Sequence, residues 1–139
     1  MALIGGGGAG NVAGGSGSSF GASNSFQLIG DHIYGYNGGV NTGSQNVNVT
    51  MFQSDTVNYY VVGKVRFSIN GSSGDDISLI IFFNDQKVYE EYAISGTADI
   101  EQPIDIIIPP YTTVKLTAAN RSAATAVEVF TTITGKVYG

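Results

Sequence analysis

The side chains that could do chemistry are few and mostly isolated. The chain of 139 residues has a single histidine, His32, and no cysteine. A hydrolase of the Ser-His-Asp type would use that histidine as its base, and Asp31 precedes it directly. Successive residues of a strand point to opposite faces of a sheet. We therefore expect the two side chains to diverge and His32 to be a surface or interface residue. One imidazole without a thiolate also argues against a zinc site.

Carboxylates occur in close pairs, which is the inventory a glycosidase needs if two of them face each other across a cleft. The pairs are Asp75 with Asp76, Glu90 with Glu91, and Asp99 with Glu101. Asp85 lies at the other end of the strand that follows Asp76, so we expect these groups to stay apart. The segment 70–76 is rich in the oxygen ligands that calcium prefers, but it lacks the EF-hand spacing. The sequence therefore predicts no enzyme activity and no cofactor.

The glycine-rich start of the chain formally contains a dinucleotide-binding pattern. Residues 5–10 match G-x-G-x-x-G. That pattern needs a preceding strand and a following helix whose N-terminus faces the pyrophosphate. Only four residues precede it and no helical pattern follows, so no nucleotide site is expected.

Eight tyrosines, in a chain without tryptophan, could supply a platform for sugar binding. They are dispersed over separate predicted strands. A tyrosine ring is apolar with a polar tip, which suits the margin of a core or a subunit contact. We therefore expect the tyrosines to cap core edges and subunit contacts.

Strand-like segments must position these groups, since β-branched and aromatic residues crowd short runs bounded by turn residues. The predicted strands are 26–36, 46–51, 57–70, 77–83, 87–94, 102–108, 113–118 and 127–137. Turns every eight to twelve residues are typical of an all-β sandwich or barrel. We predict one jelly-roll-type β-sandwich of about eight strands over residues 25–139. An immunoglobulin-like sandwich fits the pattern nearly as well.

Two of these segments have clear burial patterns. Over 57–70, Val57, Val61 and Phe67 share one parity and should face the core. Residues 77–83 are apolar on both parities, which predicts a central strand with both faces covered. On 87–94, Val88, Tyr92 and Ile94 share one parity, with Glu90 between them.

Charge excludes several kinds of partner. The net charge is −5, from six basic and eleven acidic residues, and the first basic residue is Lys64. A nucleic-acid binder needs a basic stripe, and anionic membranes repel an acidic protein. We expect neither partner. Only 12% of residues are charged, which suits a surface embedded in an assembly. The start lacks the pattern of a signal peptide and no segment reads as a membrane span, so synthesis inside a cell is expected.

The first 24 residues differ in composition from the rest. They carry no charge, and fourteen of the twenty glycines lie at or before Gly43. Glycine raises the entropy cost of ordering a chain, so we expect residues 1–24 to form an arm that orders on contact with a neighbour. The anchors of this arm would be the larger apolar side chains Leu3, Ile4, Val12 and Phe20. A flexible tail without a role is the alternative.

Four stretches, in order, resemble small virion structural proteins of marine tailed phages, cyanophages among them. They are MALIGGGGAGNVAGG, GDHIYGYNG, DIIIPPYTTVKLTAAN and TITGKVYG. The resemblance implies a single jelly roll on a virus particle, acting as a decoration, cement or minor capsid component. It also implies an inner strand at Ile106, Ile107 and Ile108, a rigid corner at Pro109-Pro110, and core positions at Val114 and Leu116. The short chain without a basic arm departs from a typical major capsid protein.

The expected function is therefore that of a virion structural protein, made in the host cytoplasm and located in the virion. It would form homo-oligomers, with a trimer as the expected number, and dock by its arm on the major capsid protein or a neighbouring virion protein. The alternative is a glycan- or receptor-binding β-sandwich on the particle surface, which needs convergent tyrosines. A hydrolase is the third hypothesis, and the residues supply no site for it.

Overall fold

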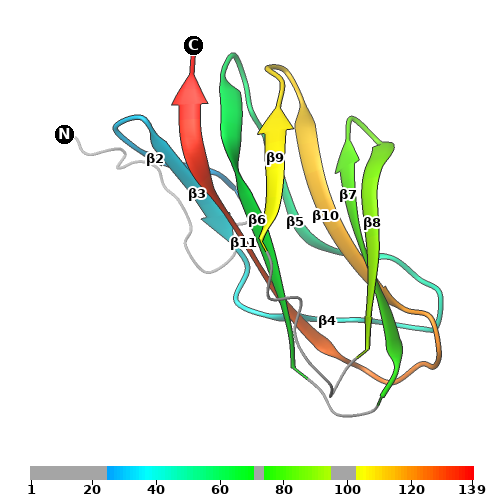
Figure 1. Ribbon diagram of the computed structural model, residues 1–139. Coiled ribbons are helices and arrows are strands. Elements are labelled where there is room, and N and C mark those ends of the chain that lie inside the picture. The colour runs from blue at the N-terminus through cyan, green and yellow to red at the C-terminus, as the bar shows by residue number, and fades with distance from the viewer. Residues whose placement is uncertain (1–24, 71–73, 95–102) are drawn as a thin grey trace.

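The structure is a computed structural model that describes residues 25–70, 74–94 and 103–139. These residues form two antiparallel sheets packed face to face, with no helix among them (Figure 1). The predicted all-β sandwich is thus confirmed. The strands are β2 (Gln27–Ile29), β3 (His32–Tyr36), β4 (Val40–Asn41), β5 (Val49–Asp55), β6 (Tyr60–Asn70), β7 (Asp76–Phe83), β8 (Gln86–Ile94), β9 (Ile104–Ile108), β10 (Thr113–Asn120) and β11 (Glu128–Tyr138).

The described residues contain ten strands, where the sequence predicted about eight. The predicted strand 26–36 is divided into β2 and β3 by a tight turn at Gly30 and Asp31. Gly30 has φ +61°, a left-handed conformation that glycine adopts without steric cost. β4 is a further short strand that pairs with β11.

The strand order interleaves segments that are distant in sequence. One sheet has the order β5-β10-β7-β8, and the other has the order β2-β3-β11-β6-β9. From β4 onward, every connection except the hairpin between β7 and β8 passes from one sheet to the other. The two longest strands, β6 and β11, lie side by side at the centre of the second sheet and pair over their whole length. They therefore form the platform on which its outer face is built.

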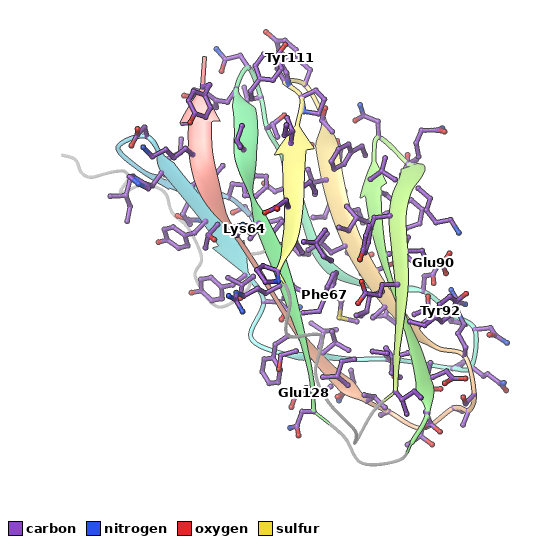
Figure 2. The ribbon with its side chains drawn as sticks, viewed as in Figure 1. Lys64, Phe67, Glu90, Tyr92, Tyr111 and Glu128 are labelled. Atoms are coloured by element: carbon purple, nitrogen blue, oxygen red, sulfur yellow. The ribbon has the colours of Figure 1, made fainter. Side chains whose placement is uncertain are left out.

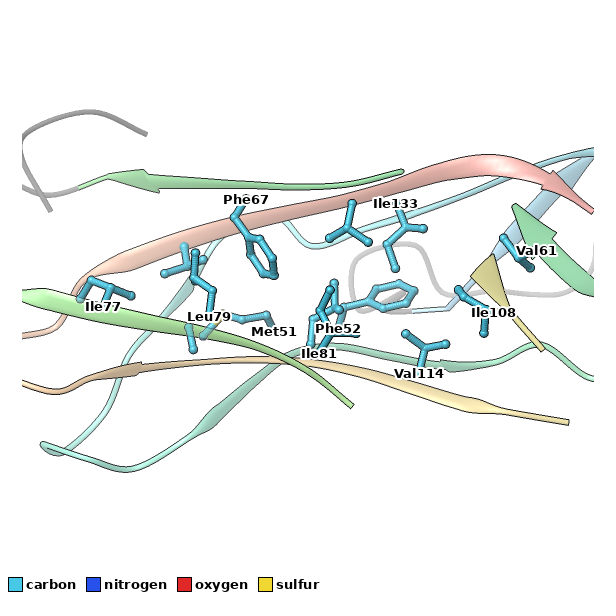
Figure 3. Close-up of a cluster of buried hydrophobic side chains, with 14 of the residues drawn as sticks. Met51, Phe52, Val61, Phe67, Ile77, Leu79, Ile81, Ile108, Val114 and Ile133 are labelled. Atoms are coloured by element: carbon cyan, nitrogen blue, oxygen red, sulfur yellow. The ribbon is translucent and has the colours of Figure 1, made fainter. Parts of the chain in front are cut away.

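The core lies between the sheets and follows the two-residue period of the strands. Figure 3 shows side chains from both sheets meeting in this layer. Its largest fully buried members are Phe52, Met51, Ile77, Leu79, Ile81, Ile108, Leu116, Ile133, Val61, Val65, Val114 and Val127. Met51 and Phe52 are consecutive, yet both are buried, because the register of β5 against β10 shifts there. A bulge of this kind re-aims a side chain toward the core.

Several predicted burial patterns are confirmed. Val61 and Phe67 face the core, and β7 is buried on both faces, with Ile80 on the outer face 2% exposed. Val114 and Leu116 are fully buried.

Two predicted inward positions are wrong, and Val47, in the predicted strand 46–51, is 49% exposed and precedes β5. Val57 is 60% exposed and lies in the turn before β6, with φ +56°. Ile107 is 65% exposed, because its parity is opposite to that of the buried Ile108 and places it on the outer face of the sheet; among the described residues, β9 pairs with β6 alone. A run of three isoleucines cannot reveal from sequence which parity faces water.

Buried polar side chains close the loops at both ends of the sandwich. The Thr56 hydroxyl donates to Pro109 O at 2.8 Å and accepts from Thr112 N at 3.1 Å. At the opposite end Asn120 is fully buried, and its amide group donates to Asp75 Oδ2 and Thr125 O. Its Oδ1 accepts from two backbone N–H groups of the following turn. Such fully satisfied groups hold the loops in one conformation.

Candidate functional site

Two glycines face each other at the centre of the second sheet. Gly63 of β6 is the register partner of Gly135 of β11. A Cβ on Gly63 would collide with Thr134 O and lie 2.9 Å from Gly135 Cα, and one on Gly135 would lie 2.7 Å from Gly63 Cα. Each glycine opens the segment Gly-Lys-Val, which places Lys64 and Lys136 on the outer face. Glycine therefore permits a close approach of two backbones that no other residue allows here.

A groove lies on the outer face above this glycine pair. Its volume is about 570 Å³, within the range of small-molecule sites. Gly63 and Gly135 line its floor. Around them stand His32, Ile33 and Tyr34 of β3, Val62 and Lys64 of β6, Asp105 of β9, and Thr134, Lys136 and Tyr138 of β11. Four neighbouring strands thus contribute to one concave surface. Figure 2 shows Lys64 over the middle of β6.

The charged groups of the groove are paired. Lys64 Nζ lies 2.5 Å from Asp105 Oδ1, and Lys136 Nζ lies 3.7 Å from Asp31 Oδ2. All four side chains are about half exposed or more, so each pair contributes little to stability. Asp31 lies beside the groove and is not part of its lining. When it is counted, two positive and two negative charges cancel, which leaves no net formal charge when His32 is neutral.

His32 contacts the carboxylate that was expected to diverge from it. Its Nδ1 lies 3.0 Å from Asp31 Oδ1. The expectation assumed that both residues are in a strand, but β3 begins at His32 and Asp31 belongs to the preceding turn. Both side chains are more than half exposed, as expected for a surface histidine. The only aliphatic hydroxyl lining the groove in the described part of the chain is that of Thr134.

The fold gathers tyrosines that the sequence distributes over separate strands. Tyr34 and Tyr36 lie on the same face of β3, with ring centroids 6.4 Å apart and planes 9° from parallel. Tyr138 lies on the same outer face and is the register partner of Tyr60 on β6. Four of the eight tyrosines thus share one face of the sheet. Sequence reasoning missed this because strand adjacency is not readable from periodicity.

A second exposed feature lies on the other sheet. β8 is an edge strand that pairs only with β7 among the described residues. Its outward parity exposes Val88 (49%), Tyr92 (62%) and Ile94 (47%), which we call the β8 strip. Figure 2 shows Glu90 and Tyr92 along this strand, away from Lys64. These residues share one parity in the sequence, and the structure places that parity outward.

Ionisable groups on β8 have shifted pKa values. A side-chain hydrogen bond to Glu91, with burial and the charge of that carboxylate, raises the pKa of Tyr89 to about 12. The hydrogen bond from Lys87 Nζ to Glu90, 2.6 Å long, lowers the pKa of Glu90. Glu90 also accepts from the Ser78 hydroxyl at 3.4 Å. These partners hold the charged residues of the edge strand in defined positions.

The acidic pairs of the sequence do not form a site in the described residues. Asp75 bonds to Asn120 at one end of β7, and Asp85 lies 3.4 Å from Lys115 Nζ at the other end. Over residues 25–70, 74–94 and 103–139, no group of three or more histidine or acidic side chains could hold a metal ion. Part of the suggested calcium loop, residues 71–73, and the pair Asp99 and Glu101 lie outside that range.

The predicted anchors of the arm lie outside the described residues. Leu3, Ile4, Val12 and Phe20 all belong to residues 1–24, so the docking role assigned to them stays a prediction. In the part of the chain that is described, there is no helix of the length and hydropathy needed to cross a bilayer.

Comparison with known proteins does not assign the chain. No protein-family model matches the sequence, and no curated protein matches it significantly.

Proposed function

We propose that this protein is a structural subunit of a multi-copy assembly, and specifically a decoration, cement or minor capsid protein of a tailed-phage particle. The subunit forms a homo-oligomer and docks on a neighbouring virion protein by its N-terminal arm. The resemblance of four sequence stretches to small virion proteins suggests the kind of particle. The structural support comes from a surface that is poor in charge and exposes apolar side chains in ordered rows.

The β8 strip is the observation that carries this proposal. Proteins that must stay monomeric blunt an edge strand with charge, proline, a bulge or short length. β8 has a bulge at Val88, where its register against β7 shifts, but it is nine residues long and exposes Val88, Tyr92 and Ile94 on one side. Glu90 interrupts the strip, but Lys87 partners its carboxylate. The strip is therefore suited to be covered by a second copy.

The strand order is consistent with the jelly roll that the resemblance implies. β3, β11, β6 and β9 oppose β5, β10, β7 and β8, with a crossing between sheets at every step but the β7–β8 hairpin. Eight strands arranged as two Greek keys define that architecture. β2 and β4 are additions at its margins. This order supports a jelly roll over the immunoglobulin-like alternative.

The arm supplies the proposed contact with the particle. Ordering about twenty residues costs on the order of 20 kcal/mol or more in backbone entropy, so one weak contact cannot hold the arm. Many subunits on one lattice offset that cost by acting together. The anchors Leu3 and Ile4 would enter an apolar groove of the neighbouring protein, and the glycines around them would permit a close approach.

Binding to particles tests this proposal. Particles assembled without the protein are mixed with the purified full chain, or with a chain lacking residues 2–20, and then sedimented. The full chain should sediment with the particles, and the shortened chain should stay in the supernatant. A matched variant with Leu3 and Ile4 changed to Ser, and otherwise full length, separates loss of the anchors from loss of length. Equal binding by all three proteins would contradict docking by the arm.

A further inference from the structure

We propose that the groove on the outer face of the second sheet binds a neutral carbohydrate chain. This site is separate from the β8 strip and does not depend on the proposed assembly role. Three features of the groove argue for it: the shape of the floor, the aromatic rings at its two ends, and the balance of its charged groups.

The floor consists of backbone where β6 and β11 approach closely. Gly63 and Gly135 are paired in register, and a Cβ on either would strike the other strand. Both glycines share the inward parity of the buried Val65 and Ile133, so the depression on the outer face is shallow, open and bordered by the outward groups of four strands. A flat, extended ligand fits such a surface better than a compact one does, because it can contact the floor and several strands at once.

Tyrosine rings lie at the two ends of this depression. Tyr34 and Tyr138 border the groove, and Tyr36 continues the row with its ring parallel to that of Tyr34. Tyr36 and Tyr34 of β3 are the register partners of Thr132 and Thr134 of β11. Tyr138 of β11 is the register partner of Tyr60 of β6. These pairs extend over about 20 Å at a rise of about 3.4 Å per residue. That length suits an oligosaccharide of several units, whose C–H faces can pack on rings while its hydroxyls stay free.

The polar groups suit hydroxyls and not a charged ligand. Lys64 and Lys136 offer donors, Asp105 and Asp31 offer acceptors, and Thr134 offers both. Each lysine is already opposed by a carboxylate. The two aspartates would repel an anionic ligand, and the two lysines would repel a cationic one. A neutral sugar hydroxyl can donate to one group and accept from its partner.

The competing occupant is the arm of another copy. Residues 1–24 also lack charged side chains, but they contain only one aromatic residue, Phe20. The row of tyrosines and the exposed ion pairs favour a polyhydroxylated ligand. The experiment below separates the two occupants.

The test uses the isotopically labelled full chain and neutral oligosaccharides of several units, built from glucose, galactose, mannose or N-acetylglucosamine. Sulfated and uronic-acid oligosaccharides of the same length serve as charged probes. Binding is followed by the amide resonances of Gly63 and Gly135. We expect at least one neutral probe to shift these two resonances and those of Thr134, with saturation and little dependence on salt.

Variants then locate the site. Tyr138→Ala should weaken binding about tenfold, and Thr134→Arg should block the floor and abolish it. Tyr92→Ala is the matched control, since it removes an exposed tyrosine from the other sheet, and it should leave binding unchanged. Thermal unfolding of each variant confirms that the fold is intact, and Lys64→Met provides a further groove variant if one of them unfolds.

Several outcomes would overturn the proposal. They are no shift with any neutral probe, shifts only with charged probes that disappear at high salt, or equal weakening by Tyr92→Ala. Displacement of the groove resonances by a synthetic peptide of residues 1–24, without a response to sugars, would assign the groove to the arm instead. The first three outcomes do not bear on particle docking, which is measured separately, whereas displacement by the peptide would give the arm a binding place on another copy.

Discussion

At the scale of single residues, two exposed side chains lie on unusual backbone. Val57 and Tyr111 have φ values of +56° and +55°. Tyr111 N donates to Val57 O at 2.5 Å, and buried hydrogen bonds between Thr56 and Thr112 hold the two loops together. A β-branched residue in the left-handed region is strained. The surrounding loops therefore impose this conformation on Val57, against its local preference.

Relief of this strain should stabilise the protein. Asparagine tolerates the left-handed region, so Val57→Asn should raise the free energy of unfolding by about 1 kcal/mol. Val47→Asn is the control, because Val47 is 49% exposed in a loop and is not among the residues with positive φ. Urea denaturation measures both variants. A loss of stability in Val57→Asn equal to that of the control would contradict strain at this position.

Tyr89 gives a pH-dependent prediction. Its pKa is raised to about 12 from an ordinary value of 10.0, mainly by the hydrogen bond to Glu91. The folded state therefore keeps the phenolic proton where the unfolded state loses it. The resulting stability is fully present below pH 10 and is lost as the pH rises toward about 12. In urea denaturation, the difference in free energy of unfolding between the native protein and Tyr89→Phe should shrink over this range.

A second measurement assigns the effect to the hydrogen bond. Absorbance titration should show one tyrosine ionising later than exposed tyrosines, and this late step should move to lower pH in Glu91→Ala, which removes both the acceptor and the negative charge. A late step that is unchanged in that variant would show that Glu91 does not cause the shift.

At the scale of elements, the sequence predicts strands with strong periodicity and fails at edges. The alternation over 57–70 predicts the inward residues of β6, and the apolar run 77–83 predicts a central strand, because both patterns record burial directly. Edge strands show no such pattern of burial in their sequences. Ile107 of β9 and Tyr92 of β8 are apolar or aromatic and yet exposed on the outer faces of their sheets, and among the described residues each of these strands pairs on one side alone. The repeated Gly-Lys-Val of β6 and β11 is the one local signal that could have indicated the groove.

The glycine pair makes a prediction about packing between elements. Gly63→Ala would place a Cβ against the backbone of β11, where no flexible side chain can move aside. We expect a loss of about 2–4 kcal/mol in the free energy of unfolding, measured by urea denaturation. Gly38→Ala is the control, because a Cβ there meets nothing within 4 Å. Equal effects of the two substitutions would mean that the strands do not approach as closely as described.

At the scale of the whole molecule, function follows from the arrangement of faces. The second sheet presents tyrosines and paired charges around a groove, and the edge of the first sheet presents the β8 strip. The sequence predicted the class of fold, but could not predict which strands are neighbours. The tyrosines are therefore dispersed in the sequence, whereas the fold places four of them on one face. The role proposed for the arm, residues 1–24, is argued from its sequence, because its anchors lie outside the described residues.

The central claim is that the subunit associates with copies of itself through the β8 strip. Light scattering coupled to size-exclusion chromatography measures this directly. The full chain should have a mass that is a multiple of 14.5 kDa, and Tyr92→Lys should reduce it to the mass of one chain. Tyr111→Lys, which changes a tyrosine that is 76% exposed in the loop before β10, should keep the oligomer. A full chain that stays monomeric at every concentration, or a Tyr92→Lys protein that still assembles, would contradict the account.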